Sequence, residues 1–229
     1  MWIQSLIPHG FHFCVPFKER GVDGVLCVTS DAHQGLRRAI EEVFTGAAWQ
    51  RCIVHMERNV VSCCKTRRIR NIIGRIVSSV FRETDPHLVR ELYSRAIDEV
   101  RSLCKSAGDM LEEAEADALV YLDFPEEHRR RLRTNNVQER MNREIKRRSR
   151  VVQVFPSIDS LVRLLGSALA EKDEEWACRH YFKGSSIRRV FERQRPEKPC
   201  EDIDALSAKA VSILEIAKDE DIVIGRRAA

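Results

Sequence analysis

The first sixty residues of the chain carry the pattern that most constrains its fold, a strand followed by a helix and a second strand. Residues 24–30, GVLCVTS, are mostly apolar or β-branched and lead directly into Asp31, which predicts a buried strand. Apolar residues recur at helical spacing from Leu36 to Phe44, and residues 48–55 predict a second strand. This order is typical of a parallel α/β unit. No glycine-rich phosphate loop lies within it, which argues against nucleotide binding.

From about Met56 onward the apolar periodicity is helical, so the predicted fold class is α/β but predominantly helical. Helices are expected over residues 69–80, 88–103, 110–122, 137–145 and 161–169. Phe155-Pro156 is expected to interrupt the chain between the last two. The basic, proline-bearing segment from Lys183 predicts a linker, followed by a weak helix near Ile203 to Lys218.

The composition is that of a soluble globular protein. Apolar residues make up 43% of the chain and charged residues 32%, and no stretch approaches the roughly 18 apolar residues that a membrane span needs. The first residues lack the pattern of a signal peptide, so we expect a cytoplasmic, nucleoid-associated protein without a membrane partner. The eight cysteines are scattered through the sequence, which predicts reduced thiols rather than a disulfide framework.

Charge is distributed unevenly, although the net charge is only +4. Residues 109–127 hold eight acidic and no basic side chains, whereas residues 128–150 hold ten basic and two acidic ones. The ten basic residues are Arg129, Arg130, Arg131, Arg133, Arg140, Arg143, Lys146, Arg147, Arg148 and Arg150. Such a block is expected where a protein contacts a phosphate backbone. It equally fits a solvated helix face or a partner for the acidic block.

Two carboxylates are candidates for metal ligation. Asp31 stands at a predicted strand end, where the main chain is rigid, although an aspartate there can instead cap the following helix. Glu139 lies off the apolar seam of its predicted helix, beside asparagines, and fits either metal ligation or solvation. Converging carboxylates can hold two divalent ions for phosphodiester cleavage, but such a site needs at least a third ligand.

Cys52 and His55 have a C-x2-H spacing, and Cys63-Cys64 follow. No second clean pair of ligands accompanies them, so we expect a buried thiol and a hydrogen-bonded histidine rather than zinc. We also do not expect Cys52 and His55 to face each other as a catalytic pair would. His33, near Asp31, has two interpretations. It assists a scissile phosphate, or it stands at the start of the helix without a role in the chemistry.

Three separated runs resemble a known family, the bacterial insertion-sequence transposases of the Mutator type. They are VTSDAHQGLRRAIEEVFTGAAWQRCIVHMERNV, then FPEEHRRRLRTNNVQERMNREIKRRSRVVQVFPSIDSLVRLLGSAL, and DEEWACRHYF. The resemblance covers roughly residues 18–182. It implies a partial RNase H-like core over residues 18–55, an all-helical insertion over 56–127, and core-completing helices over 128–182.

The resemblance also implies a function and a site. In the family an Asp, Asp, Glu triad binds two Mg2+ or Mn2+ ions and cleaves and joins DNA. On that pattern Asp31 matches the second Asp and Glu139, in NNVQERMN, matches the Glu, with Glu144 as the rival. The family's C-x2-H motif falls on Cys52 and His55. The implied partners are DNA, at transposon ends and targets, and further copies of the transposase.

The match departs from the family at its start. The first catalytic Asp of the family lies on a strand upstream of this segment, and Asp23 is too near Asp31 in the chain to replace it. Residues 1–17 form an atypical, possibly frameshifted start, and residues 183–229 a linker and tail. We therefore expect a transposase fragment that cannot cleave DNA alone, associating with a missing N-terminal portion. The alternative is a catalytically dead remnant that binds DNA or mixes into transposase oligomers.

Overall fold

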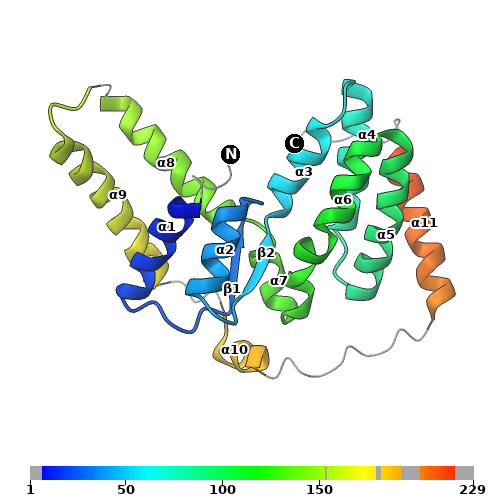
Figure 1. Ribbon diagram of the computed structural model, residues 1–229, viewed down its shortest axis with the longest axis horizontal. Coiled ribbons are helices and arrows are strands. Elements are labelled where there is room, and N and C mark those ends of the chain that lie inside the picture. Colours follow the sequence, from blue (N-terminus) through cyan, green and yellow to red (C-terminus); the bar gives the residue numbers. More distant parts are fainter. Residues whose placement is uncertain (1–6, 153, 179–181, 192–201, 220–229) are drawn as a thin grey trace. The chain divides into compact units, whose positions relative to one another are not determined.

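The computed structural model describes residues 7–152, 154–178, 182–191 and 202–219 (Figure 1). The chain divides into two units, one formed by residues 1–134 and 194–229 and the other by residues 135–193. The first unit contains a small α/β part and a larger helical part. The second is formed by helices alone in the residues that the structure describes.

The strand, helix and strand predicted near the start of the chain are present. Strand β1 (Cys27–Ser30), helix α2 (Gln34–Val43) and strand β2 (Ala48–Arg51) form a two-stranded parallel sheet with one crossover helix. The register pairs Cys27 with Ala48 and Ser30 with Arg51. Gly46, with a φ of 84°, occupies the left-handed region in the turn between α2 and β2, where glycine is favoured.

The second strand is shorter than predicted, and the expectation of a strand as far as His55 is wrong. Helix α3 (Ile53–Ser62) begins two residues after β2 ends. Ile53, Met56 and Val60 are all buried in the helical core, and their spacing is that of one helix face. The packing of this face against the helices that follow favours a helix over a continued strand.

Helix α1 (Ile7–Glu19) covers most of the region that the sequence analysis describes as an atypical start. It packs against α2. Cys14 is buried together with Ala39, Ile40, Val43 and Trp49 in a small core on this side of the sheet. The Nζ of Lys18 also donates a hydrogen bond to the Val43 carbonyl at the end of α2 (3.2 Å).

The larger core of the first unit is formed by the predicted helical insertion. Its helices are α3, α4 (Arg67–Val80), α5 (Pro86–Leu103) and α6 (Lys105–Ala118), followed by a 3-10 turn (Val120–Asp123) and α7 (Glu126–Leu132). Asp85 begins α5 by accepting hydrogen bonds from the N–H groups of His87 and Leu88. The predicted helices are confirmed, except that the one expected as far as residue 122 ends at Ala118.

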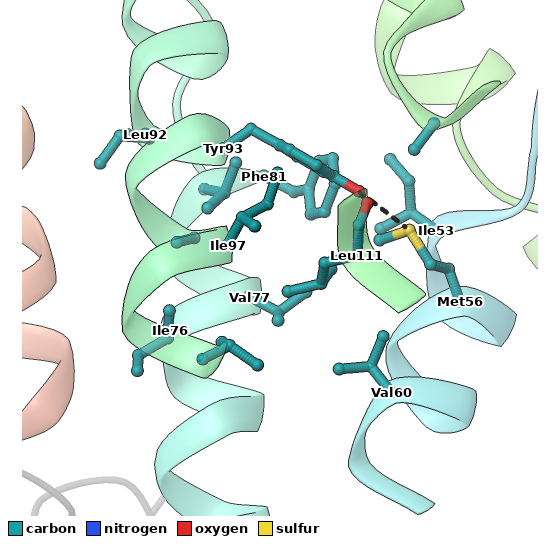
Figure 2. Close-up of a cluster of buried hydrophobic side chains, with 14 of the residues drawn as sticks. Ile53, Met56, Val60, Ile76, Val77, Phe81, Leu92, Tyr93, Ile97 and Leu111 are labelled. Carbon is teal, nitrogen blue, oxygen red and sulfur yellow. Dashed lines mark hydrogen bonds between the residues drawn. The ribbon is translucent and has the colours of Figure 1, made fainter. Parts of the chain in front are cut away.

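Tyr93 lies at the centre of this core (Figure 2). Its hydroxyl donates to the Leu111 carbonyl oxygen (2.8 Å) and lies 3.6 Å from the Met56 sulfur. Phe81 packs edge-on against its ring, with centroids 6.0 Å apart. Because a buried phenol needs a polar partner, these contacts fix the relative positions of α3, α5 and α6.

Helix α11 (Ile203–Lys218) confirms the helix that the sequence predicts over the same residues. It packs on α4 and α5 (Figure 1), with Ala210, Leu214 and Ala217 buried in the same core. The Arg75 guanidinium donates to the carbonyls of Ala217 (2.8 Å) and Lys218 (3.3 Å), which would otherwise be unpaired at the helix end. The weak helix of the sequence analysis is therefore part of the insertion's core.

The second unit contains α8 (Asn136–Val152), α9 (Ile158–Ala177) and α10 (Gly184–Phe191). The predicted break at Phe155-Pro156 is confirmed, and Ser157 and Ser160 form a capping box that begins α9. Helix α10 lies within the segment predicted to be a linker, and the rest of that segment, 192–201, lies outside the described residues. Across all the described ranges, the structure has no helix with the length and apolarity that crossing a lipid bilayer requires.

Candidate functional site

Asp31 follows the last residue of β1, at the carboxyl edge of the sheet, and its side chain is exposed. The capping interpretation is wrong, because α2 begins at Gln34 and its cap position falls on His33. The Nδ1 atom of His33 accepts the Leu36 N–H (3.2 Å), which leaves Nε2 to carry the proton in the neutral ring. Helix capping is therefore the described role of His33, and the Asp31 carboxylate is not used for it.

The main chain of Asp31 is held firmly. Its carbonyl oxygen accepts hydrogen bonds from the Ser30 hydroxyl (2.9 Å) and from the His33 N–H (2.9 Å). Among the contacts given for the described residues, none involves the Asp31 carboxylate. The chain thus presents an uncommitted carboxylate from a fixed position, which is what a ligand or a general base requires.

Cys52 and His55 lie at the same edge, and the expectation that they do not face each other is wrong. Cys52 is the residue before the first turn of α3, and His55 lies within that turn. The His55 Nδ1 atom and the Cys52 Sγ atom are 3.2 Å apart. The Cys52 N–H also donates to the Ser30 carbonyl (2.7 Å), which joins this corner to the end of β1.

The burial of Cys52 decides what this pair can do. Its side chain has no exposed surface, whereas His55 is half-buried. A nucleophilic thiol must be reached by its substrate, so this thiol holds the imidazole in place rather than attacking anything. Within the described parts of the chain, no group of three or more His, Cys, Asp and Glu side chains is arranged to hold a metal ion.

The segment after α7 returns to the carboxyl edge of the sheet. The Thr29 hydroxyl donates to the Leu132 carbonyl, and the Ile53 N–H donates to the Arg133 carbonyl (3.0 Å). These bonds fix residues 132–133 beside the end of β1 and the start of α3. Glu139 follows Arg133 by only six positions in the chain, although it belongs to the second unit.

Gln50, which the sequence analysis did not single out, fixes β2 on the helical insertion. It is fully buried, and its Nε2 donates to the carbonyls of Arg51 (2.7 Å) and Ala118 (2.9 Å). Its Oε1 accepts the Tyr121 N–H (2.7 Å). The sequence feature that could have identified Gln50 is a glutamine inside an apolar strand pattern. A buried amide must have its hydrogen bonds satisfied by the rest of the fold, so such a residue predicts a structural contact.

The basic residues of the predicted DNA-binding segment divide into different environments. In the first unit Arg129 donates to the carbonyls of Phe124 (2.8 Å) and Thr84 (3.2 Å), and Arg133 donates to the Phe81 carbonyl. These two guanidiniums stabilise the ends of local helices and turns. Arg130 and Arg131 are exposed on α7, although Arg131 also takes part in a contact within the fold.

On α8 the two candidate glutamates lie on different faces. Glu144 is bound by Arg147 (2.7 and 2.9 Å) and Arg148 (2.9 Å), and these hydrogen bonds lower its pKa to about 2. Arg148 also pairs with Glu171 of α9 (2.6 Å), which secures the packing of the two helices. Glu144 is therefore committed to an ion-pair network inside the second unit.

Glu139 lies on another face of α8 and is half-exposed. At 100° per residue, Arg143, Lys146 and Arg150 share this face with it, and all three are exposed. Arg140 is also exposed, and its guanidinium donates to the Asn136 carbonyl (3.3 Å). The apolar seam of Met141 and Ile145 lies on the opposite side. Among the described residues, this face of α8 combines one carboxylate with a row of uncovered positive charges.

Four side chains of the acidic block form ion pairs within the first unit. Asp109 and Glu112 pair with Arg101, Asp117 with Arg37, and Asp123 with Arg90. All of these arginines precede the acidic block in the sequence. These four acidic residues thus stabilise the first unit.

The chain belongs to a family of transposases. The family is described as "Transposase, Mutator family", and its model matches residues 11–178. The chain is 37% identical over 168 residues to the transposase for insertion sequence element IS1081 of Mycobacterium tuberculosis, covering 73% of this chain and 40% of that transposase. The resemblance stated from the three sequence runs is therefore confirmed.

Two further relatives come from other bacteria. The transposase for insertion sequence element IS406 of Burkholderia multivorans is 36% identical over 160 residues, which cover 69% of this chain and 40% of the relative. The transposase for IS256 in transposon Tn4001 of Staphylococcus aureus is 36% identical over 165 residues, with 69% and 41% covered. The chain thus spans about two fifths of the length of the relatives that it matches.

Proposed function

We propose that this chain forms part of the catalytic region of a DNA transposase. In this proposal β1, α2 and β2 belong to an RNase H-like core, and Asp31 and Glu139 are two of its catalytic carboxylates. The observation that carries the proposal is the Asp31 carboxylate, exposed and uncommitted at the carboxyl edge of the sheet. Support comes from the relatives, which are insertion-sequence transposases by name.

The geometry favours Glu139 over Glu144 as the second carboxylate. Glu144 already accepts hydrogen bonds from two guanidiniums, and a metal ion would have to displace both. Glu139 follows the segment whose carbonyls are fixed at the sheet edge by Thr29 and Ile53, and the intervening chain is short. That Asp31 and Glu139 serve one site in the complete enzyme is what the resemblance to the family implies.

The fit of these residues to Mg2+ or Mn2+ is partial. Carboxylate oxygens are the ligands that such ions prefer, so the chemistry of the donors is suitable. The number of ligands is too small, because the described residues assemble no group of three His, Cys, Asp or Glu side chains that could hold a metal ion. We therefore assign Asp31 and Glu139 as candidate ligands and derive no reaction step through the metal.

The proposed partner is DNA, and we therefore also propose association with the nucleoid. Arg143, Lys146 and Arg150 form an exposed basic row on the Glu139 face of α8, and such a row attracts the phosphate backbone whatever the base sequence. Transposition by a complete protein involves two DNA ends, so we also propose that further copies of the transposase take part.

The test uses a chimera in which this chain replaces the matching 168 residues of the Mycobacterium tuberculosis relative. Excision of a donor insertion sequence is measured with Mg2+ or Mn2+. We expect Asp31→Asn and Glu139→Gln to abolish excision and Glu144→Gln to preserve it. Normal excision by Asp31→Asn would remove Asp31 from the site, and loss of excision in Glu144→Gln alone would reverse the assignment on α8.

A second candidate function is DNA binding without cleavage, as in a remnant that mixes into transposase oligomers. The lack of a three-ligand cluster among the described residues favours it. Its signature is an inactive chimera whose unaltered chain still binds duplex DNA and protects it from nuclease digestion. Excision by the chimera would exclude it.

A further inference from the structure

One stretch of the helical insertion carries basic residues without any acidic ones. Residues 58–82 hold seven basic side chains and no acidic one, and the seven are Arg58, Lys65, Arg67, Arg68, Arg70, Arg75 and Arg82. Arg75 is used at the end of α11, and Arg58 and Arg68 take part in other interactions. Apart from Arg82, the positive charge that remains lies between the end of α3 and the first turns of α4.

The tertiary structure brings one more basic residue to this place. The Cys104 thiol donates to the Cys63 carbonyl (3.8 Å), which sets the start of α6 beside the end of α3. The Nε of Arg70 donates to the Cys64 carbonyl (2.7 Å), which holds the start of α4 at the same corner. Lys105, the first residue of α6, therefore lies at the same end of the insertion as the first turn of α4 (Figure 1).

These contacts define a surface that we call the basic corner, formed by Lys65, Arg67, Arg70 and Lys105. All four residues are exposed. Among the contacts given for the described residues, none joins any of the four to a carboxylate. The basic corner thus presents positive charge of one sign to the solvent.

Basic side chains elsewhere in the same unit are mostly neutralised by carboxylates. The ion pairs are Arg90–Asp123, Arg95–Glu91, Arg101–Glu112, Lys209–Glu83 and Lys218–Glu99. An ordinary solvated surface of this unit therefore mixes both signs. The basic corner differs from it, because no carboxylate of the described residues pairs with it.

The positive side chains of the basic corner do not stabilise the helices on which they lie. Arg67 and Lys105 are the first residues of α4 and α6, and neither helix has an acidic residue in its first turn. The free N–H groups at the start of a helix carry partial positive charge, which favours anionic side chains there and disfavours cationic ones. The side chains and the helix ends therefore add to one positive potential, which attracts an anion.

We propose that the basic corner is a second DNA-binding surface, which contacts the phosphate backbone of a duplex. The inference rests on the proposed DNA partner and adds a contact in the helical insertion, in a different unit from the basic row on α8. Several uncovered positive charges with no carboxylate among them match a polyanion, whatever its base sequence. Residues 58–75 contain no aromatic side chain on which unpaired bases could stack, which favours duplex over single-stranded DNA.

The first experiment maps lysine protection in the unaltered whole chain. An amine-acetylating reagent is applied with and without a mixed-sequence duplex of about 30 base pairs at low salt, and modified lysines are quantified by mass spectrometry. We expect the duplex to slow acetylation of Lys65 and Lys105 at least about threefold, and high salt to remove this protection. Lys209, an exposed lysine that pairs with Glu83 in the same unit, should change little.

The second experiment removes the charges of the basic corner. The triple variant Lys65→Ala, Arg67→Ala and Lys105→Ala removes no ion pair of the described residues, so its melting temperature should stay close to that of the unaltered chain. Duplex binding should weaken at least about tenfold at physiological salt, and the slope of log K against log salt should fall by about 2–3.

A matched control removes three charges that are already paired in the same unit. The control is the triple variant Arg90→Ala, Lys209→Ala and Lys218→Ala. It should change the affinity and the salt slope much less than the variant of the basic corner. An equal loss of affinity in the control would overturn the proposal, because net charge alone would then explain the binding.

Lys146 on α8 separates this inference from the proposed function. Protection of Lys146 without protection of Lys65 and Lys105 would keep DNA as the partner and overturn the basic corner. Protection of none of the three lysines would contradict the proposed DNA partner and the basic corner together.

Discussion

The His55 imidazole and the Cys52 thiol are in contact, with 3.2 Å between Nδ1 and Sγ, although the two residues are three positions apart at the end of a strand. The contact exists because the chain leaves β2 at Arg51 and begins α3 at Ile53. One helical turn brings His55 back over the residue that precedes the helix. The C-x2-H motif therefore joins the end of the sheet to the first helix of the insertion.

Breaking this contact should destabilise the first unit. Cys52→Ala and His55→Ala should each lower the free energy of unfolding by about 1–2 kcal/mol, because each removes a hydrogen bond at a mostly buried corner. The measurement is urea denaturation of both variants and of the double variant. A double-mutant cycle should give a coupling of about 0.5–1.5 kcal/mol, and strict additivity would show that the contact contributes nothing.

Gly108 in α6 should tolerate no side chain. A Cβ atom there would lie 2.5 Å from the Arg101 Cβ and 2.6 Å from the Arg101 Cα of α5, so the two helix backbones would have to separate. We expect Gly108→Ala to cost about 1–3 kcal/mol in thermal or urea unfolding. Gly166→Ala is the matched control, because a Cβ there meets nothing within 4 Å and helix propensity favours alanine by up to about 1 kcal/mol. Equal effects at both glycines would contradict this account.

The ion pairs of Glu144 predict a pH dependence in the second unit. Hydrogen bonds from Arg147 and then Arg148 lower the pKa of Glu144 from 4.5 to about 2. The pKa of Glu144 in the folded state lies below its value in the unfolded state. The stabilisation that its ion pairs give to the second unit is therefore fully present above about pH 4.5. It is lost as the pH falls through about 2.

An NMR titration of the Glu144 carboxyl carbon checks this value, and its midpoint should fall near pH 2. Added salt should move the midpoint upward, because the network is at the surface and is screened. Glu144→Gln should remove the corresponding acid-induced loss of α8–α9 stability. A midpoint near 4.5 at low salt would show that the guanidiniums do not hold this carboxylate.

Basic residues in different environments should respond differently to substitution. Arg143→Ala and Lys146→Ala should weaken duplex DNA binding and each reduce the slope of log K against log salt by about 1, without changing the melting temperature. Arg133→Ala should instead cost about 1–3 kcal/mol of stability, because the Phe81 carbonyl loses its donor. Binding measured at several salt concentrations, with melting curves for each variant, distinguishes the two roles.

Local patterns predicted most of the secondary structure. The stripe from Ile69 to Val80 gave α4, Asp85-Pro86 marked the start of α5, and Phe155-Pro156 separated α8 from α9. These features depend on side-chain periodicity and capping within a few residues, which a sequence displays directly. The length of β2 did not follow from local pattern, because Ile53 and Val54 suit a strand as well as a helix until the core that buries Ile53 is known.

The sequence alone determined the order of strand, helix and strand, the run of helices that follows, the family, and Asp31 as the residue at the end of the first strand. The tertiary structure decided which side chains are already in use. It showed that His33 caps α2, that Arg133 holds the Phe81 carbonyl, and that α11 completes the core of the insertion. The reason is that hydrogen bonds and burial join residues distant in the chain, and neither periodicity nor charge along a sequence records those distances.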